Sequence, residues 1–322
     1  MVTLRSPAPQ DRPAIEKLFR DYPFKTYQRK QQGLDSDLLG GFFADRFLGK
    51  SLSGEGFHRV ALREGQIIGA ISLMPDRWHS DHYGIRMGRI SQFVSYLDPR
   101  EASPALLESA FGAAREAGYQ HLSVRMDCQD CRNLQQLEAG GFYLVDCSAK
   151  VSRRWSVPPE YPRPAPDLEV RPYRAADLGE IREIAASSHE RNHYYNDGFL
   201  PREKTRELFA NWVSRCCGGL ANSVFVLEKD GTVVGFVTFL ENKALASACR
   251  TRILVLDFIA LRPDVQGKGL GRYVLSEALR AIGPEYPLCE LRTSIYNYAA
   301  LALYSLFDFR VVSSDFILHR VM

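Results

Sequence analysis

The feature that most constrains the fold is an internal repeat, because the same order of strand and helix patterns occurs twice along the 322 residues. The stretch VTLRSPAPQDRPAIEKLF corresponds to LEVRPYRAADLGEIREIA in the second half, and each predicts an alternating strand followed by a helix. Arg5 then corresponds to Arg171, and Asp11 to Asp177. One match can arise by chance, but an ordered series along both halves indicates a duplicated domain.

The correspondence continues through two predicted hairpins. HRVALREGQIIGAISLM and NSVFVLEKDGTVVGFVTFL each contain β-branched strands that turn at Gly65 or Gly231, with a second glycine at Gly69 or Gly235. Another strand, a helix, a strand, a short helix and a last strand follow in both halves. We therefore expect an α+β fold with two similar domains, each a mixed, mostly antiparallel central sheet flanked by helices.

The predicted domain boundary is a proline-rich segment. Residues 156–167, SVPPEYPRPAPD, contain five prolines, which fix an extended backbone and exclude both a helix and a central strand. A length of 322 residues also favours two units of ordinary size. The sequence therefore predicts a first domain over 1–155, a linker over 156–167 and a second domain over 168–322.

Composition limits the partners and the compartment. With 45% hydrophobic and 25% charged residues, and a net charge of +3 that is spread along the chain, neither disorder nor nucleic-acid binding is indicated. The chain shows no signal peptide and no apolar run long enough to span a membrane, so we expect a cytoplasmic protein with no membrane partner. Seven irregularly spaced cysteines suit a reducing compartment, and Cys128 and Cys131 are interpreted as ordinary thiols.

The two halves differ at the turn that follows the third strand of the repeat. The second half has RPDVQGKGLGRY, in which glycines at 267, 269 and 271 allow a tight turn that exposes N–H groups. A helix is predicted from the apolar positions Leu270, Val274, Leu275, Ala278, Leu279 and Ile282. The start of such a helix attracts phosphate, although many strand-to-helix turns need glycine for steric reasons alone.

Two familiar phosphate-binding patterns are excluded. A Walker A loop needs Gly-Lys-Ser or Gly-Lys-Thr, and a dinucleotide fold needs its glycine turn near the start of a βαβ unit. The pattern here is a strand, an Arg-Pro turn, the sequence Gln266-x-x-Gly269-x-Gly271 and then a helix. This pattern resembles the acyl-CoA site of the GCN5-related N-acetyltransferases. This resemblance covers the second half and, in weaker form, the first. It implies two tandem domains of that fold, of which the first is degenerate.

The resemblance also implies a co-substrate, acetyl-CoA or another acyl-CoA, and no metal. The fourth strand would offer its main chain to pantetheine, and Asn297 would contact pantetheine as well. The glycine turn would hold the pyrophosphate. The implied cofactor-binding residues are therefore Phe258, Ile259, Ala260, Leu261, Gln266, Gly267, Lys268, Gly269, Leu270, Gly271, Arg272 and Asn297.

Two residues are the predicted catalytic groups. By resemblance, Tyr304 would donate a proton to the departing thiolate, although an Ala- and Leu-rich helix can also carry a packed core tyrosine. Asp257 lies on the same strand face as Ile259, and would act as the base or only bind substrate. In the first half Leu137 stands opposite Tyr304 and Asp130 opposite Asn297, so we expect no catalysis there. The family's usual Gly-Phe after this helix is here Asp308-Phe309.

The stretch SHERNHYY contains H-E-x-x-H, the spacing with which two histidines on a helix hold zinc in metallopeptidases. Arg191 places a cation inside the motif and a turn signal follows it, so we prefer a wall of the acceptor site to a zinc site. Mixed donors, acceptors and aromatic faces suit a polyhydroxylated ligand. The predicted substrate-binding residues are His189, Asn192, His193, Tyr194, Tyr195 and Asn196.

The expected reaction is transfer of an acetyl or other short acyl group from acyl-CoA to a primary amine of a small molecule. The stretch GFLPREKTRELFANWV is loosely similar to the TDP-fucosamine N-acetyltransferases, with Phe199, Leu208 and Trp212 as anchors, which favours a nucleotide-linked aminosugar as acceptor. An amino acid, an antibiotic or a polyamine are the competing acceptors, and a CoA-binding module without catalysis is the competing class. A homodimer is compatible with the sequence.

Overall fold

The computed structural model describes residues 1–24, 33–97, 99–188 and 192–322. The chain forms two compact units. Unit 1 comprises Met1–Ser148 together with Ser313–Met322, and unit 2 comprises Ala149–Val312. Among the described residues, no helix combines the length and the apolar character needed to cross a membrane.

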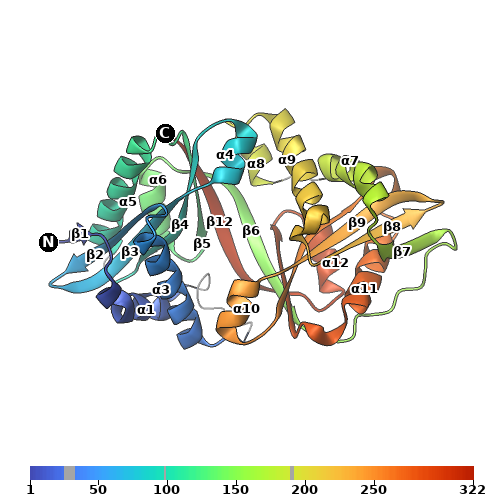
Figure 1. Ribbon diagram of the computed structural model, residues 1–322, viewed down its shortest axis with the longest axis horizontal. Helices are drawn as coiled ribbons and strands as arrows, with labels where there is room; N and C mark the ends of the chain where they lie inside the picture. Colours follow the sequence, from blue (N-terminus) through green and yellow to red (C-terminus); the bar gives the residue numbers. More distant parts are fainter. Residues whose placement is uncertain (25–32, 98, 189–191) are drawn as a thin grey trace. The chain divides into compact units, whose positions relative to one another are not determined.

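Unit 1 is built on a mixed sheet with the strand order β1-β2-β3-β4-β5-β12 (Figure 1). All of these neighbours are antiparallel except β4 and β5, which are parallel. The elements of this half of the chain are β1 (Thr3–Arg5), η1 (Pro9–Asp11), α1 (Arg12–Asp21), α3 (Ser36–Leu52), β2 (Phe57–Arg63), β3 (Gln66–Pro75), α4 (Arg77–Tyr83), β4 (Met87–Ser95), α5 (Pro99–Glu116), β5 (His121–Asp127), α6 (Cys131–Ala139) and β6 (Tyr143–Arg154).

Unit 2 repeats this order as β7-β8-β9-β10-β11, and β6 follows β11. Here β10 and β11 are the parallel pair. The elements of this half are β7 (Leu168–Pro172), η3 (Ala175–Asp177), α7 (Leu178–Ser188), α8 (His193–Asn196), α9 (Arg202–Arg215), η4 (Cys216–Leu220), β8 (Ser223–Lys229), β9 (Thr232–Glu241), α10 (Lys243–Cys249), β10 (Ile253–Leu261), η5 (Pro263–Val265), α11 (Leu270–Ile282), η6 (Gly283–Glu285), β11 (Leu288–Ser294), α12 (Tyr298–Ser305) and β12 (Arg310–Val321).

The predicted α+β class and the duplication are confirmed, and the match extends to side chains. The Arg5 guanidinium donates to both oxygens of Asp11 at 2.6 and 2.7 Å, and Arg171 donates to both oxygens of Asp177 at 2.8 and 2.9 Å. In each unit this ion pair joins the first strand to the short turn before the first helix. The shared geometry is what a duplicated domain predicts.

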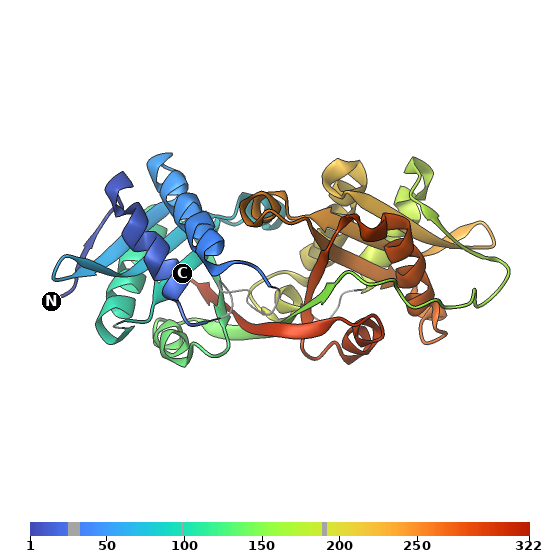
Figure 2. The same ribbon diagram turned by 90° about the horizontal axis from the view of Figure 1, so that it is seen from below.

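Each sheet is covered on both faces by helices of equivalent position. In unit 1, α1 and α3 pack a core on one face and α5 and α6 pack a core on the other (Figure 2). In unit 2, α7 and α9 cover one face, and α11 and α12 cover the other. Apolar residues at helical spacing supply these cores, as in α11, where every predicted apolar position from Leu270 to Leu279 is buried. Unit 2 therefore has a layer of helices on each side of β10.

The structure divides the chain differently from the predicted boundary in one respect. The last strand, from Ser313 on, belongs to unit 1, where β12 pairs with β5. The end of β6, from Ala149 on, belongs instead to unit 2, where Lys150 forms an ion pair of 2.9 Å with Glu290 of β11. Each unit is thus completed by a strand from the other half of the chain.

The proline-rich segment also differs from a free linker, because it packs on unit 2. The Ser276 hydroxyl of α11 donates to the carbonyl oxygen of Pro159 at 2.6 Å. The Tyr161 ring lies 5.7 Å, centroid to centroid, from that of Phe307. Prolines lack an N–H but keep the carbonyl acceptor, so the segment can bond to a helix without joining a sheet.

Candidate active site

The glycine loop, residues 266–272, connects β10 to α11. Gly267 and Gly269 have φ values of 74° and 78°, a left-handed conformation in which a side chain would be strained. Gly269 is the N-cap of α11 and offers no side-chain oxygen to the first turn. The first N–H groups of a 13-residue helix therefore lack a side-chain cap, and this arrangement can accept an anionic ligand.

Two side chains of the glycine loop donate hydrogen bonds to the backbone just before the loop. Gln266 Nε2 donates to the Leu261 carbonyl oxygen at 2.8 Å, and Lys268 Nζ donates to the Asp264 carbonyl oxygen at 3.0 Å. Both bonds tie the loop to the segment that precedes it. The main chain, rather than the Gln266 side chain, is therefore the part of the loop that can present donors to a phosphate.

The rest of the glycine loop contacts its surroundings in three ways. Leu270 is buried in the core of unit 2, and the exposed Arg272 lies with its guanidinium 5.3 Å from the centre of the Tyr161 ring. A Cβ atom built on Gly271 would come within 3.5 Å of Leu303 on α12. The loop is thus close to the helix that carries Tyr304.

The pairing of strand β10 with its parallel neighbour β11 ends before β10 reaches this loop. The register of β10 with β11 covers Ile253–Val255, whereas its register with β9 continues to Leu261 and contains a bulge at Asp257. The predicted pantetheine-binding stretch 258–261 therefore lies where the β10–β11 ladder has ended. Phe258 and Ala260 are buried on the face covered by α7 and α9, so a ligand along this edge would contact main-chain atoms.

Tyr304 lies in α12 and is 5% exposed. Burial raises the pKa of its phenol, and the neighbouring Cys289 acts in the same direction. Among the described residues its hydroxyl has no hydrogen-bond partner, although the ring packs 5.9 Å from that of Phe309. A phenol that stays protonated and has no acceptor is chemically able to donate a proton to a ligand.

Asn297 has a structural role that the sequence did not predict. Its Oδ1 accepts the N–H of Ala300 at 3.3 Å as the N-cap of α12, and its Nδ2 donates to Thr293 Oγ1 at 3.2 Å. Asp130 caps α6 of unit 1 in the same way, accepting the N–H of Asn133 at 3.3 Å. The two positions are equivalent, and capping alone accounts for both.

Asp257 is held by side chains from the face opposite α12. Its Oδ2 accepts Trp212 Nε1 at 2.8 Å, Thr238 Oγ1 at 3.2 Å and Cys216 Sγ at 3.6 Å. Its Oδ1 has no partner among the described residues. Burial raises the pKa of the carboxyl group, and these three hydrogen bonds work against that rise. One oxygen is therefore fixed while the other can accept a proton.

The predicted acceptor wall is described from Asn192 onward; His189, together with Glu190 and Arg191, lies outside the described residues. Asn192 caps α8, accepting the N–H of Tyr194 at 2.8 Å. His193 opens α8, and its ring centroid lies 3.8 Å from that of Tyr194. Asn192 has an extended backbone, and α8 begins at His193.

Two residues of the predicted acceptor wall, Asn196 and Tyr195, contact other parts of unit 2. Asn196 Nδ2 donates to the Tyr296 hydroxyl at 2.8 Å, next to the start of α12. The Tyr195 ring is parallel to that of Phe209 on α9 at 6.5 Å, and Phe209 contacts Phe258 of β10 at 6.1 Å. The structure thus brings Tyr195 and Asn196 near both β10 and α12.

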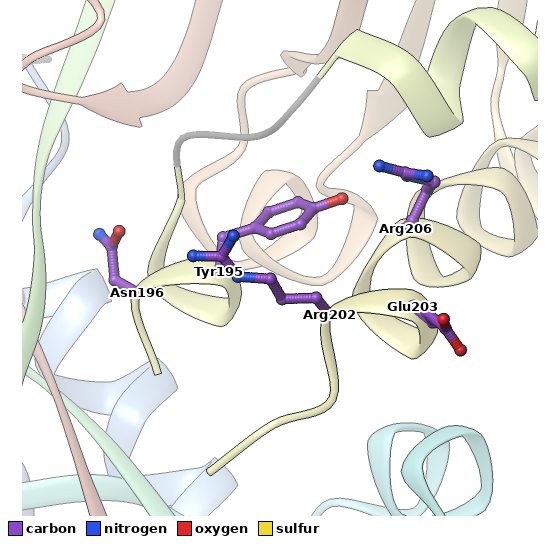
Figure 3. A pocket seen from close by; sticks show the side chains of 5 residues that line it. All are labelled: Tyr195, Asn196, Arg202, Glu203 and Arg206. Atoms are coloured by element: carbon purple, nitrogen blue, oxygen red, sulfur yellow. The ribbon is translucent and has the colours of Figure 1, made fainter. Parts of the chain in front are cut away.

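A pocket of about 400 Å³ opens beside the wall (Figure 3). It is lined by Tyr195, Asn196, Arg202, Glu203 and Arg206. The arginines and the Trp212–Thr238–Cys216 set around Asp257 are site residues that the sequence analysis missed. The i, i+4, i+7 spacing of Arg202, Arg206 and Phe209 is the signal that could have placed the arginines beside the wall.

The fold of the whole chain is similar to that of solved GCN5-related N-acetyltransferases, including a tandem one. A GCN5-related N-acetyltransferase from Sphaerobacter thermophilus is similar over 99% of this chain and 95% of its own, with a TM-score of 0.65 and 14% identity. A tandem GNAT protein from the clavulanic acid biosynthesis pathway is similar over 100% of this chain and 98% of its own, with a TM-score of 0.56 and 14% identity. At these identities the likeness shows the fold.

Residues 180–309, which lie within unit 2, match the acetyltransferase (GNAT) family. The family uses acetyl-CoA as its co-substrate. The spore coat polysaccharide biosynthesis protein SpsD of Bacillus subtilis (strain 168) is 26% identical over 168 residues, which are 51% of this chain. The match spans about half of that relative, 55% of its length.

Proposed function

We propose that unit 2 transfers an acetyl or other short acyl group from acyl-CoA to the primary amine of a small molecule, and that the amine belongs to a nucleotide-linked aminosugar. The observation that carries the proposal is the glycine loop at the uncapped start of α11, beside the edge where β10 parts from β11. Backbone N–H groups at a helix start suit the pyrophosphate of CoA, and a strand edge suits the amides of pantetheine.

The proposed chemistry uses one acid and one base. Bound acyl-CoA supplies a thioester, whose C–S bond breaks as the C–N bond to the amine forms. Asp257 Oδ1 accepts the proton that the amine loses, and Tyr304 donates its proton to the departing sulfur. The raised pKa of Tyr304 keeps this acid protonated at neutral pH. Unit 1 has Leu137 at the position of Tyr304, each the seventh residue of its helix, and we propose that it has no activity of its own.

The acceptor class rests on the wall and on the relative. Asn196, Tyr195 and the neighbouring arginines offer many polar atoms beside aromatic faces, as polyhydroxylated ligands require. The relative SpsD is named for polysaccharide biosynthesis, which is consistent with a sugar acceptor. An amino acid or a polyamine would leave much of this polar surface without a partner.

The test is an amine panel with acetyl-CoA, in which released thiol is measured. Free aminosugars, their nucleotide-linked forms, amino acids, aminoglycosides and polyamines form the panel. We expect the highest turnover with a nucleotide-linked aminosugar. If no amine releases thiol while calorimetry detects CoA binding, the protein is a CoA-binding module. If CoA does not bind either, the proposal fails at its first step.

The acid is tested by Tyr304→Phe, which removes only the hydroxyl. Loss of a general acid lowers kcat by about 100-fold or more, while CoA affinity changes little because the ring remains in the core. Tyr298→Phe is the matched control, since Tyr298 lies on the same helix and is 75% exposed. Equal turnover of the Tyr304→Phe variant and the wild type would remove the assignment.

A further inference from the structure

Two cysteine thiols of unit 1 lie in contact, away from the candidate active site of unit 2. Cys128 Sγ and Cys147 Sγ are 3.6 Å apart, both thiols are free, and both residues are half-buried. Cys128 follows the last residue of β5, and Cys147 lies in β6. A disulfide bond is about 2.05 Å long, so the two sulfurs need to approach each other by about 1.5 Å. The pair is therefore close to the geometry of a disulfide.

Strand β12 lies between the two strands that carry these thiols. The strand order of unit 1 ends β5-β12, and β6 follows β12. The main-chain N–H of Cys128 donates to the Ser314 carbonyl oxygen of β12 at 3.1 Å. A bond between the sulfurs would join the two neighbours of β12 and close a loop between residues that are 19 apart in the chain. Such a cross-link restricts the unfolded chain and so stabilises the folded one.

The second half of the repeat shows that the sheet does not need this pair of thiols. Along the repeat, Cys128 corresponds to Ile295 and Cys147 to Ser314. Both halves form the same order of strands, although the second half has no cysteine at either position. The packing of the fold therefore does not account for two thiols in contact.

The surroundings of the two sulfurs assign them different parts in an oxidation. Burial raises the pKa of the Cys147 thiol, and its hydrogen bond to Cys128 acts in the same direction. Cys147 therefore stays protonated at neutral pH, which leaves Cys128 to attack an oxidant first. The exposed Cys131 contacts the main chain of Cys128, with its Sγ 3.9 Å from that carbonyl oxygen.

We propose that Cys128 and Cys147 form a reversible disulfide when the protein meets hydrogen peroxide. The Cys128 thiolate attacks one peroxide oxygen, the O–O bond breaks, and hydroxide leaves to become water, so that Cys128 becomes a sulfenic acid. The Cys147 sulfur then attacks the Cys128 sulfur. The S–O bond breaks, and the hydroxyl group leaves as water with the proton of the Cys147 thiol. The two sulfurs supply the electrons that reduce the peroxide, and a dithiol reverses the reaction.

The first test treats the reduced, full-length protein with hydrogen peroxide, alkylates the remaining thiols and maps linked peptides by mass spectrometry. We expect the protein to lose two of its seven free thiols and the peptides of Cys128 and Cys147 to be joined, with a mass lower by two hydrogen atoms. Dithiothreitol should restore both thiols. A disulfide between Cys128 and Cys131, sulfinic acid at Cys128 without a disulfide, or seven thiols that all stay free would each overturn the proposal.

Two variants separate this pair from the C-x-x-C spacing. Cys147→Ser should form no disulfide with Cys128, whereas Cys131→Ser, the matched control, should still form it. Oxidation should raise the Tm of the wild type and of Cys131→Ser by about 5 °C or more and leave that of Cys147→Ser unchanged. The melting curves of the reduced proteins show whether each variant is folded. Loss of the disulfide in a folded Cys131→Ser protein, or the same Tm for the oxidised and reduced wild type, would contradict the bridge.

Discussion

If the proposed base is Asp257, the pKa of its carboxyl group sets how the activity responds to pH. Burial raises the pKa of its carboxyl group, while the hydrogen bonds from Trp212, Thr238 and Cys216 to Oδ2 favour the ionised form. A base must be ionised, so activity is lost as the pH falls through this raised pKa. The acidic limb of kcat/KM should therefore lie above the ordinary aspartate pKa of about 3.9.

The hydrogen bond from Trp212 of α9 to Asp257 can be removed separately. Trp212→Phe deletes the 2.8 Å hydrogen bond and keeps an aromatic ring. Because this bond lowers the pKa of Asp257, its loss raises the pKa and moves the acidic limb of kcat/KM to higher pH. Trp155→Phe changes a tryptophan that is not among these donors to Asp257, and it should leave the limb in place. An unchanged profile for Trp212→Phe would show that Asp257 is not the titrating base.

The backbone conformation of Asp308 shows how an aspartate can stand where the family usually has a glycine. It has a φ of 59°, in the left-handed region, and its equivalent in unit 1 is Gly141, with a φ of 83°. Both residues lie in the turn that follows the short helix of their half, and each precedes a buried phenylalanine. Aspartate tolerates this conformation better than most residues, which is why the turn survives without glycine.

At the scale of elements, the same ion pair is placed in two different environments. In unit 2 the Arg171 and Asp177 side chains are 9% and 7% exposed, and Arg171 also binds Glu228 at 2.7 Å. In unit 1 the Arg5 side chain is 42% exposed. Removing Asp177 leaves the buried Arg171 with Glu228 as its remaining carboxylate partner, whereas Arg5 in unit 1 is exposed to water, so the costs should differ.

We expect Asp177→Ala to lower the free energy of unfolding by about 3 kcal/mol or more. Asp11→Ala, the matched variant, should cost about 1 kcal/mol, because water replaces most of the exposed pair. Arg171 lowers the pKa of Asp177, so this stabilisation is present at neutral pH and is lost as the pH falls through the lowered pKa. Denaturant unfolding at two pH values measures the difference, and equal costs would contradict it.

At the scale of the whole molecule, the exchanged strands decide which fragments can fold. Ser313–Met322 completes unit 1, where β12 runs antiparallel to β5 from Asp315 to Val321. Residues from Ala149 to Arg154 complete unit 2 beside β11, and the main-chain N–H of Trp155 donates to Pro287 at 2.9 Å. A cut in the proline-rich segment would separate each unit from one of its strands.

The fragment 149–312 should therefore fold, and the fragment 168–322 should not. The first retains the strand next to β11, whereas the second exposes that edge and also carries a strand that belongs to unit 1. Circular dichroism and thermal melting of the two fragments provide the measurement. A cooperative melt of 168–322 with none for 149–312 would contradict the exchange.

The sequence alone determined the features that depend on local order. The duplicated strand and helix pattern, the glycine loop and the helix after it were predicted because periodicity and backbone conformation act over a few residues. The equivalence of Asp130 with Asn297, and of Leu137 with Tyr304, followed from the same repeat, and the structure places each pair at the same helix position.

Only the tertiary structure decided which sheet each last strand joins and which side chains surround the site. The final strands of the two halves have similar alternating patterns, so either could complete either sheet. The donors to Asp257 come from 41 and 45 residues earlier in the chain, and from β9, 19 residues earlier. The arginine pocket likewise depends on how α9 packs against β10. These outcomes arise from packing between distant segments, which no local pattern encodes.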